Sequence, residues 1–208
     1  MNEADKLIVF DTETTGLNPD EDEIIQLSII NGDGEVLFNE YIRPESKTEW
    51  PEAQKIHNIS PEMVADKPGY QAFLENVKGI FERAEVIVAY NNAYDVEMIR
   101  KWGIDLDDKP QVDVMKDFAI YYGEFVPEYN EFKWQKLRKC ADYFGYDFKA
   151  HDSLEDVKAT LYCYRRLEAM KEDGRYMDRV KENVERIWGV KNKERTDQKK
   201  AGMQKGGG

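Results

Sequence analysis

A short apolar run near the start of the chain, Leu7 to Phe10, ends abruptly in polar and acidic residues. Such a short run with β-branched members is typical of a strand that is buried on both faces of a sheet. Two further strands are predicted over residues 24–30 and 36–42, because the Asn-Gly-Asp-Gly sequence between them is a strong hairpin signal. The first 42 residues therefore predict three strands in succession, at least two of them antiparallel.

Strands and helices alternate in the remainder of the chain. Apolar residues at helical spacing predict helices over 70–83 and 93–102, with strands over 86–90 and 112–115. Helices are then expected near 117–123, 134–144, 153–170 and 176–189. This order predicts an α/β fold in which helices cover a mixed sheet. We expect one domain over residues 1–190 and a basic, disordered tail over 191–208, which holds six basic and two acidic residues.

The composition argues against several classes of function. A net charge of -12 counts against a protein that coats nucleic acid or an anionic membrane, since both contacts depend on basic residues. No apolar stretch approaches the roughly 20 residues of a membrane-spanning helix, and the polar start of the chain is unlike a secretory signal. Cys140 and Cys163 are far apart and fall in helical patterns. We therefore expect reduced core cysteines in a cytoplasmic protein.

Two carboxylates, Asp11 and Glu13, follow the first strand directly. If the strand continues, their side chains point to the same face, roughly 6.5 Å apart along the strand. Such a pair is tolerated best when a cation lies between the carboxylates, and Mg²⁺ prefers oxygen ligands of this kind. The alternative is that both carboxylates cap the turn at the strand end by accepting hydrogen bonds from the amides of residues 14–16.

Two further acidic residues stand near the starts of helices. Asp95 follows the strand predicted over 86–90, and Asp156 lies in the first turn of a helix predicted from residue 153. Either could simply be an acid that the helix dipole favours, but the ends of sheet strands are also where binding sites form. His151 precedes the second helix, where it could be a general base, although a lone histidine is more often a surface or core residue. Four carboxylates and a histidine fit two-metal hydrolysis of a phosphodiester.

Three blocks of this sequence, taken together, resemble the motifs of a known family, the DnaQ-like DEDDh 3′–5′ exonucleases. In chain order the blocks are V-F-D-T-E-T-T-G-L, Y-N-N-A-Y-D and H-D-S-L-E-D-V-K-A-T. The segment P-E-A-Q-K-I-H-N-I-S-P-E-M-V also resembles a loop of this family, which includes the epsilon proofreading subunit of bacterial replicative DNA polymerase. The resemblance covers residues 6–170 and implies a ribonuclease H-like mixed sheet of five strands flanked by helices.

The resemblance also implies a role for each matching residue. Two Mg²⁺ or Mn²⁺ ions would be bound by Asp11, Glu13, Asp95 and Asp156. His151 would be the general base, because the sister subgroup instead has a tyrosine four residues before the last aspartate, and that position is Asp152 here. The 3′-terminal nucleotide would be held by Thr14, Gly16, Leu17, Ile56, His57 and Tyr94. Departures from the family pattern, none of them at a metal ligand, are Asn58, Tyr90 and Ser153.

The implied activity is removal of nucleotides from the 3′ end of single-stranded DNA, with release of nucleoside 5′-monophosphates. RNA trimming uses the same constellation, and nothing in these motifs reads the 2′-hydroxyl. A second alternative is a nuclease-like subunit that mainly binds a polymerase or another nucleic-acid complex, with the basic tail as the attachment. A calcium-binding protein is disfavoured, since the acid-rich stretches 20–23 and 105–108 do not continue into a calcium loop.

One basic and aromatic segment, residues 133–139, belongs to none of these motifs. Its four basic residues surround Trp134 and are Lys133, Lys136, Arg138 and Lys139. The segment could contact the phosphates of a strand and stack a base. The same pattern also fits an amphipathic helix with Trp134, Leu137 and Cys140 turned inward and the basic residues in solvent. We favour the amphipathic helix.

Overall fold

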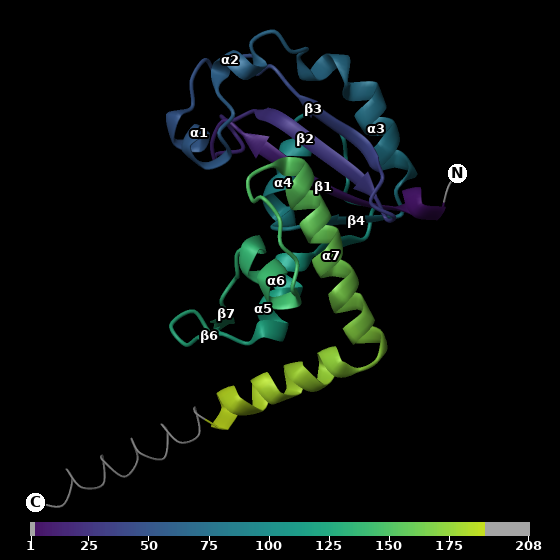
Figure 1. The fold of residues 1–208 in the computed structure, drawn as a ribbon, viewed down its shortest axis with the longest axis vertical. Coiled ribbons are helices and arrows are strands. Elements are labelled where there is room, and N and C mark those ends of the chain that lie inside the picture. Colours follow the sequence, from purple (N-terminus) through teal and green to yellow (C-terminus); the bar gives the residue numbers. More distant parts are fainter. Residues whose placement is uncertain (1–2, 190–208) are drawn as a thin grey trace, which may run out of the picture.

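The computed structural model describes residues 3–189, so the tail predicted over 191–208 and its attachment role lie outside the described residues. At the centre is a five-stranded sheet with the strand order β3-β2-β1-β4-β5 (Figure 1). β2 is antiparallel to β1 and β3, whereas β4 is parallel to β1 and β5. The predicted mixed sheet of five strands is therefore confirmed. Its strands are β1 (Leu7–Thr14), β2 (Ile24–Asn31), β3 (Val36–Tyr41), β4 (Val86–Ala89) and β5 (Gln111–Asp113).

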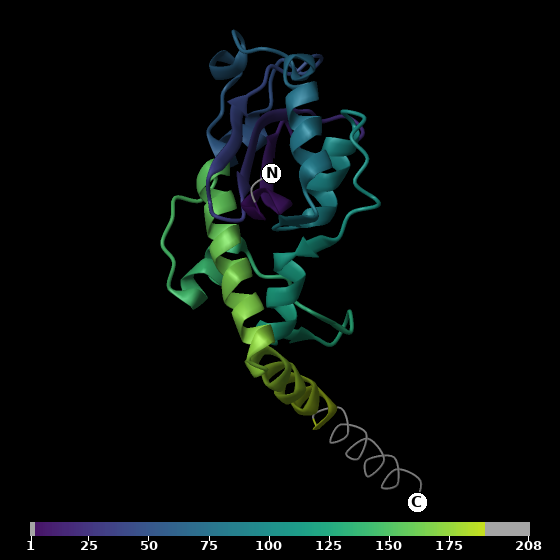
Figure 2. The ribbon, with the colours of Figure 1, turned by 90° about the vertical axis from the view of Figure 1, so that its right-hand side faces the viewer.

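Helices cover both faces of the sheet (Figures 1 and 2). α3 and α4 pack on one face, and α5, α6 and α7 pack on the other. A further helix over 175–189 continues from α7 and projects away from the sheet. The short helices α1 and α2 lie near the carboxyl end of β1 (Figure 1). The bounds are η1 (Glu3–Lys6), α1 (Pro51–His57), α2 (Pro61–Val64), η2 (Tyr70–Ala72), α3 (Leu74–Arg83), α4 (Asn92–Arg100), α5 (Val114–Tyr122), α6 (Leu137–Phe144) and α7 (Ser153–Glu172).

β1 is the central strand, and its side chains alternate between the two faces. Ile8 and Phe10 pack into the core that α3 and α4 cover. Val9 packs into the opposite core, under α5, α6 and α7. Because side chains alternate along a strand, Asp11 and Glu13 continue the face of Val9, on the side of α7. The carboxylates of Asp11 and Glu13 therefore lie beside the first turn of α7.

The structure corrects some of the predicted element boundaries. β5 ends at Asp113 because this side chain caps α5, accepting hydrogen bonds from two amides of the first turn. The strand predicted over 112–115 was therefore too long. A small hairpin of β6 (Phe125–Val126) and β7 (Glu131–Phe132) was not predicted at all. α6 begins at Leu137, so the segment 134–136 is not helical.

The cysteines and the hydropathy of the helices were the subject of two further predictions. Cys140 and Cys163 are both buried, as expected of core residues. No helix within residues 3–189 is both long and apolar enough to cross a membrane.

Candidate active site

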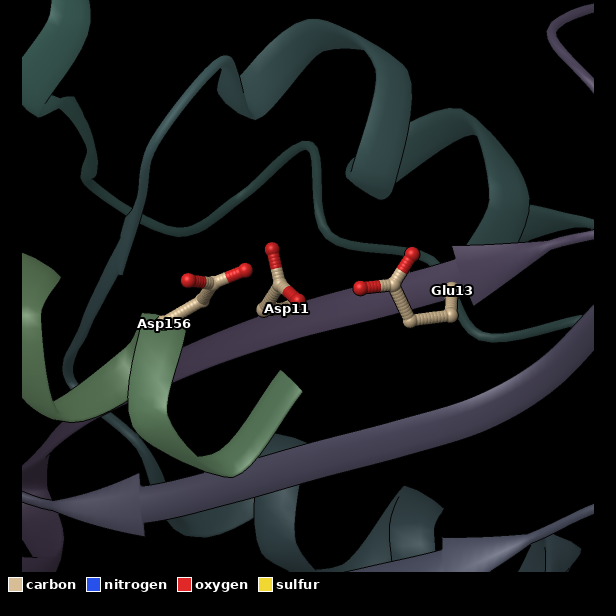
Figure 3. A group of neighbouring side chains, drawn as sticks. All are labelled: Asp11, Glu13 and Asp156. Carbon is tan, nitrogen blue, oxygen red and sulfur yellow. The ribbon is translucent and has the colours of Figure 1, made fainter. Parts of the chain in front are cut away.

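Three carboxylates from two elements meet at the carboxyl end of β1. One oxygen each from Asp11, Glu13 and Asp156 lies within 4.8 Å of the other two. Figure 3 shows the three side chains in a row above β1, with Asp156 reaching in from α7. The arrangement follows from the strand alternation and from Asp152, which caps α7 by accepting a hydrogen bond from the amide of Glu155. The cap starts the helix at a point where Asp156 faces the strand.

Hydrogen bonds hold the start of α7 against β1 but leave part of the acidic cluster without partners. The Ser153 hydroxyl donates to the Asp11 carbonyl at 3.1 Å, and the His151 amide donates to Asp156 Oδ2 at 3.1 Å. Asp11 Oδ2 and Asp156 Oδ1 are buried and accept no hydrogen bond from residues 3–189. Buried carboxylate oxygens without donors are costly, and a hard divalent cation would satisfy them.

The electrostatics of the acidic cluster also favour a bound cation. Burial, reinforced by the charges of Asp95 and Glu13, raises the pKa of Asp11 well above its usual range. Burial and the charge of Asp156 raise the pKa of Glu13 to about 8. Burial likewise raises the pKa of Asp156 to about 7, although the hydrogen bond from the His151 amide opposes the shift. The charges of Glu13 and Asp156 thus disfavour ionisation of Asp11, the charge of Asp156 disfavours ionisation of Glu13, and a bound cation would reverse both effects.

Asp95 is buried beside this group but reaches it from the other face of the sheet. It lies on α4, and its Oδ1 accepts a hydrogen bond from Thr12 Oγ1 at 2.5 Å. Burial raises the pKa of Asp95 to about 7, against the lowering effect of the Thr12 hydrogen bonds. Of the four predicted ligands, three are grouped within 4.8 Å and Asp95 lies outside that group. Thr12, which orients Asp95, was not predicted.

The alternative role for Asp11 and Glu13, capping the turn after β1, is filled by another residue. Asp22 accepts hydrogen bonds from the Asn18 amide and the Thr15 hydroxyl, each at 2.9 Å. The Thr15 amide donates to the Glu23 carbonyl instead of to either acid of β1. The turn is therefore closed by its own acidic loop, and the β1 carboxylates remain available as ligands.

His151 lies at the rim of the acidic cluster. Its backbone has a φ of 67°, and its amide binds Asp156, while its side chain is exposed to solvent. The residue thus stands beside the carboxylates, in the segment between α6 and α7, with its ring outside the cavity next to the cluster.

That cavity has a volume of about 560 Å³ and opens beside Asp11, Glu13 and Asp95. Its lining includes all six residues predicted to hold a nucleotide, namely Thr14, Gly16, Leu17, Ile56, His57 and Tyr94. Leu17 is 84% exposed and Ile56 is 52% exposed, so two apolar side chains stand in solvent at its mouth. Lining residues that were not predicted include Trp50, Glu52, Tyr90 and Asn91.

Hydrogen bonds fix the wall of this cavity. Tyr94 donates its hydroxyl to the Gly16 carbonyl at 2.6 Å and lies 2.9 Å from the Thr14 hydroxyl. His57 Nδ1 accepts from the Ile59 amide at 3.0 Å, so Nε2 carries the proton and donates to the Thr14 carbonyl at 3.2 Å. Burial lowers the pKa of His57, in keeping with this neutral form. Both ring nitrogens of His57 are thus engaged by the backbone, and its role here is to position the wall.

Comparison with known proteins now identifies the family. A model of the RNase T family, described as an exonuclease, matches residues 8–164. The chain belongs to this exonuclease family. The resemblance to DnaQ-like DEDDh exonucleases, predicted from three motifs, is confirmed, and the protein is an enzyme of the nuclease class.

This exonuclease is similar to proteins of several kinds. It is 31% identical over 169 residues to an uncharacterized exonuclease (CP81) of Escherichia phage 186, covering 76% of this chain and 85% of that protein. It is 26% identical over 192 residues to a PolC-type DNA polymerase III of Thermotoga maritima, covering 86% of this chain and 13% of the polymerase. It is 28% identical over 174 residues to RNA exonuclease 4 of Aspergillus fumigatus, covering 79% of this chain and 51% of that protein.

A solved structure supports the fold. The zinc-bound complex of Escherichia coli exonuclease I with single-stranded DNA aligns with a TM-score of 0.64 at 22% identity, covering 83% of this chain and 42% of that chain. The predicted ribonuclease H-like architecture is therefore confirmed. The chain spans less than half of that exonuclease and a small part of the polymerase, so their substrates and partners do not transfer directly.

Proposed function

We propose that this exonuclease removes nucleotides from the 3′ end of single-stranded DNA and releases nucleoside 5′-monophosphates. The observation that carries the proposal is the pair of buried oxygens without donors, Asp11 Oδ2 and Asp156 Oδ1, beside a cavity with an apolar mouth. Such a site combines ligands for a cation with room for one unpaired nucleotide. A duplex would have to open before its end could enter.

The donor set suits divalent metal ions, with Asp11, Glu13, Asp95 and Asp156 as the residues that would hold them. Carboxylate oxygens are the ligands that Mg²⁺ and Mn²⁺ prefer. When bound, two such ions would activate the attacking water and stabilise the departing 3′ oxygen. The Thr12 hydroxyl donates a hydrogen bond to Asp95 and would orient its carboxylate toward the end of β1.

The other residues of the site would position the nucleotide and move the proton. The exposed side chains of Leu17 and Ile56 offer apolar surface on which a base can rest. Tyr94 holds the segment that carries Thr14 and Gly16 in place. His151 would accept the proton of the attacking water on its ring, and its exposure to solvent would let it pass that proton to bulk water after each cycle.

The test is digestion of a 5′-labelled single strand of 20 nucleotides with Mg²⁺. We expect the wild-type enzyme to yield a ladder that shortens from the 3′ end. Asp11→Ala should lose this activity, and His151→Ala should lower its rate by about 10²- to 10⁴-fold. The matched control is Asp66→Ala, because Asp66 is exposed and its one ion pair within residues 3–189 is with its neighbour Lys67. Undiminished shortening by both site variants would refute the assignment.

RNA is the second candidate substrate, because a relative that aligns with 79% of this chain is named an RNA exonuclease. DNA is favoured here through the similarity to the polymerase, which aligns with 86% of the chain. Matched DNA and RNA strands, digested side by side, decide between them. A higher kcat/KM for RNA would replace DNA by RNA in the proposal without changing the roles of the carboxylates.

A further inference from the structure

A second cavity, of about 670 Å³, lies at the N-terminal end of α6. We call the α6 surface its aromatic side chains together with its basic side chains that form no ion pair in the described part of the chain, namely Tyr122, Trp134, Lys136, Lys139 and Tyr143. None of these residues belongs to the site described above. Three of its residues, Trp134, Lys136 and Lys139, come from the segment 133–139, for which the sequence allowed either an amphipathic helix or a nucleic-acid contact.

The amphipathic-helix interpretation fails at Trp134. This residue precedes α6, and its side chain is 58% exposed, whereas Cys140 is buried as expected. Trp50 and Trp102, by contrast, are only 4% and 8% exposed. Tyr143, on α6 itself, is 47% exposed. The α6 surface therefore presents two large aromatic side chains to solvent at the edge of one cavity.

The lysines of the α6 surface carry charge that the protein does not neutralise. No carboxylate within residues 3–189 forms an ion pair with Lys136 or Lys139, and the Lys139 ammonium lies 4.6 Å from the centre of the Tyr122 ring. Lys133 is different, because it pairs with Glu124 at 2.7 Å. In a chain of net charge -12, two unpaired cations beside exposed aromatic rings favour a ligand with both phosphates and bases.

The α6 surface is joined to the active site through one short contact. Tyr90 lines the active-site cavity, and its hydroxyl donates to the Gln135 carbonyl at 2.7 Å. Gln135 lines the second cavity and stands between Trp134 and Lys136 in the chain. Tyr90 and Gln135 thus join the linings of the two cavities.

A second connection runs through the segment that carries His151. Arg138 on α6 donates to the Phe148 carbonyl and pairs with Asp147 at 2.8 Å. The N-terminal turn of α6 is thus tied to the 145–152 segment, which borders the acidic cluster. Both connections keep the α6 surface at a fixed position relative to the carboxylates.

We propose that the α6 surface binds the single strand upstream of the 3′-terminal nucleotide, with phosphates at Lys136 and Lys139 and a base stacked on Trp134. This inference rests on the proposed function and extends it from the terminal nucleotide to the body of the strand. Stacking on an aromatic ring is tolerant of sequence, because every base has a π-face. Activity on a long strand should therefore depend on the α6 surface, whereas activity on a dinucleotide should not.

The test compares Trp134→Ala and the double variant Lys136→Ala/Lys139→Ala with wild type. Trp188→Ala is the aromatic control, since Trp188 is 62% exposed at the end of the helix over 175–189, and Lys78→Ala on α3 is the lysine control. Binding of a fluorescein-labelled 20-nucleotide strand of thymidylate is measured by anisotropy in EDTA. Digestion of the same strand and of a dinucleotide is measured with Mg²⁺.

We expect Trp134→Ala to weaken binding of the 20-nucleotide strand by about 5- to 150-fold, the range of base stacking on aromatic rings. The double lysine variant should reduce the slope of log affinity against log salt by about 1.4, at about 0.7 for each phosphate contact. Trp134→Phe should recover part of the affinity, because a smaller ring still stacks. The value of kcat/KM should fall for the 20-nucleotide strand and stay unchanged for the dinucleotide.

Unchanged binding of the long strand by both variants would overturn the inference, and so would an equal loss of activity on the dinucleotide. The control variants must behave as wild type, otherwise the loss is not specific to the α6 surface. Failure of the proposed function gives a different result, since the wild-type enzyme would then digest neither substrate. The binding measurement in EDTA tests the α6 surface even in that case.

Discussion

Removing one charge from the acidic cluster should stabilise the protein when divalent metal is absent. Glu13→Gln keeps the size and polarity of the side chain but cannot ionise. Burial and the charge of Asp156 raise the pKa of Glu13 from 4.5 to about 8 in the folded state. A carboxyl whose pKa is raised by folding binds more protons in the folded than in the unfolded chain. Its stabilising contribution is therefore present below pH 4.5 and lost as the pH rises through 8.

The size of the effect follows from this shift. Each unit of pKa difference corresponds to about 1.4 kcal/mol, so linkage gives a loss of about 4 kcal/mol at pH 8 and about 1 kcal/mol at pH 5. Partial access of solvent to Glu13 reduces these values. In EDTA we therefore expect Glu13→Gln to exceed wild type in free energy of unfolding by about 2–4 kcal/mol at pH 8, and by about 1 kcal/mol or less at pH 5.

Urea unfolding monitored by circular dichroism at both pH values gives the comparison. Glu40→Gln is the control, since Glu40 is exposed on β3 and should leave stability unchanged at either pH. Addition of Mg²⁺ should stabilise wild type by about 2.7 kcal/mol at a metal concentration 100 times the Kd, and should stabilise Glu13→Gln by less. If Glu13→Gln is no more stable than wild type at pH 8 in EDTA, the carboxylates do not repel one another as argued, and the case for a cation site loses its electrostatic support.

Three further predictions concern the cavity wall and the tail. Tyr94→Phe removes the hydroxyl that holds the Gly16 carbonyl, so kcat/KM should fall by about 2- to 10-fold while the fold persists; an unchanged value would mean that the bond does not position the wall. Gly16→Ala would place a Cβ 2.4 Å from Asp22 Oδ2, and urea unfolding should show a loss of about 1–3 kcal/mol, with equal stability contradicting the close approach. Truncation after residue 190 should leave digestion of oligonucleotides intact; a loss of activity would assign the tail a catalytic or substrate-binding part.

The sequence predicted most reliably those side-chain positions that depend on a single strand or helix. The alternation along β1 was sufficient to place Asp11 and Glu13 on one face, and the helix predicted from residue 153 was sufficient to place Asp156 in a first turn. Asp95 is different, because its distance from the others depends on α4 packing against the opposite face. The position of Asp95 relative to β1 is set by tertiary packing, so no local sequence pattern predicts it.

Other elements were missed because their sequence signal is short or misleading. β6 and β7 have two residues each, too few for an alternating pattern to emerge. Residues 134–144 show helical periodicity, yet α6 begins at Leu137 and Trp134 turns to solvent. Periodicity identifies the apolar face of a helix but does not show where the helix starts, and the position of Trp134 depended on that start.

The net charge of -12 and the proposed binding of a nucleic acid are compatible because the strand would contact only a few local groups. The excess of acid includes the ligand set at the end of β1, where bound cations would replace repulsion of phosphate by attraction. Lys136 and Lys139 stand at the α6 surface, whose cavity is linked to the active-site cavity by the Tyr90–Gln135 hydrogen bond. The excess of negative charge on the whole chain would weaken non-specific contact with the rest of the strand. An acidic protein with a local basic route is thus suited to hold one end of a strand without coating its length.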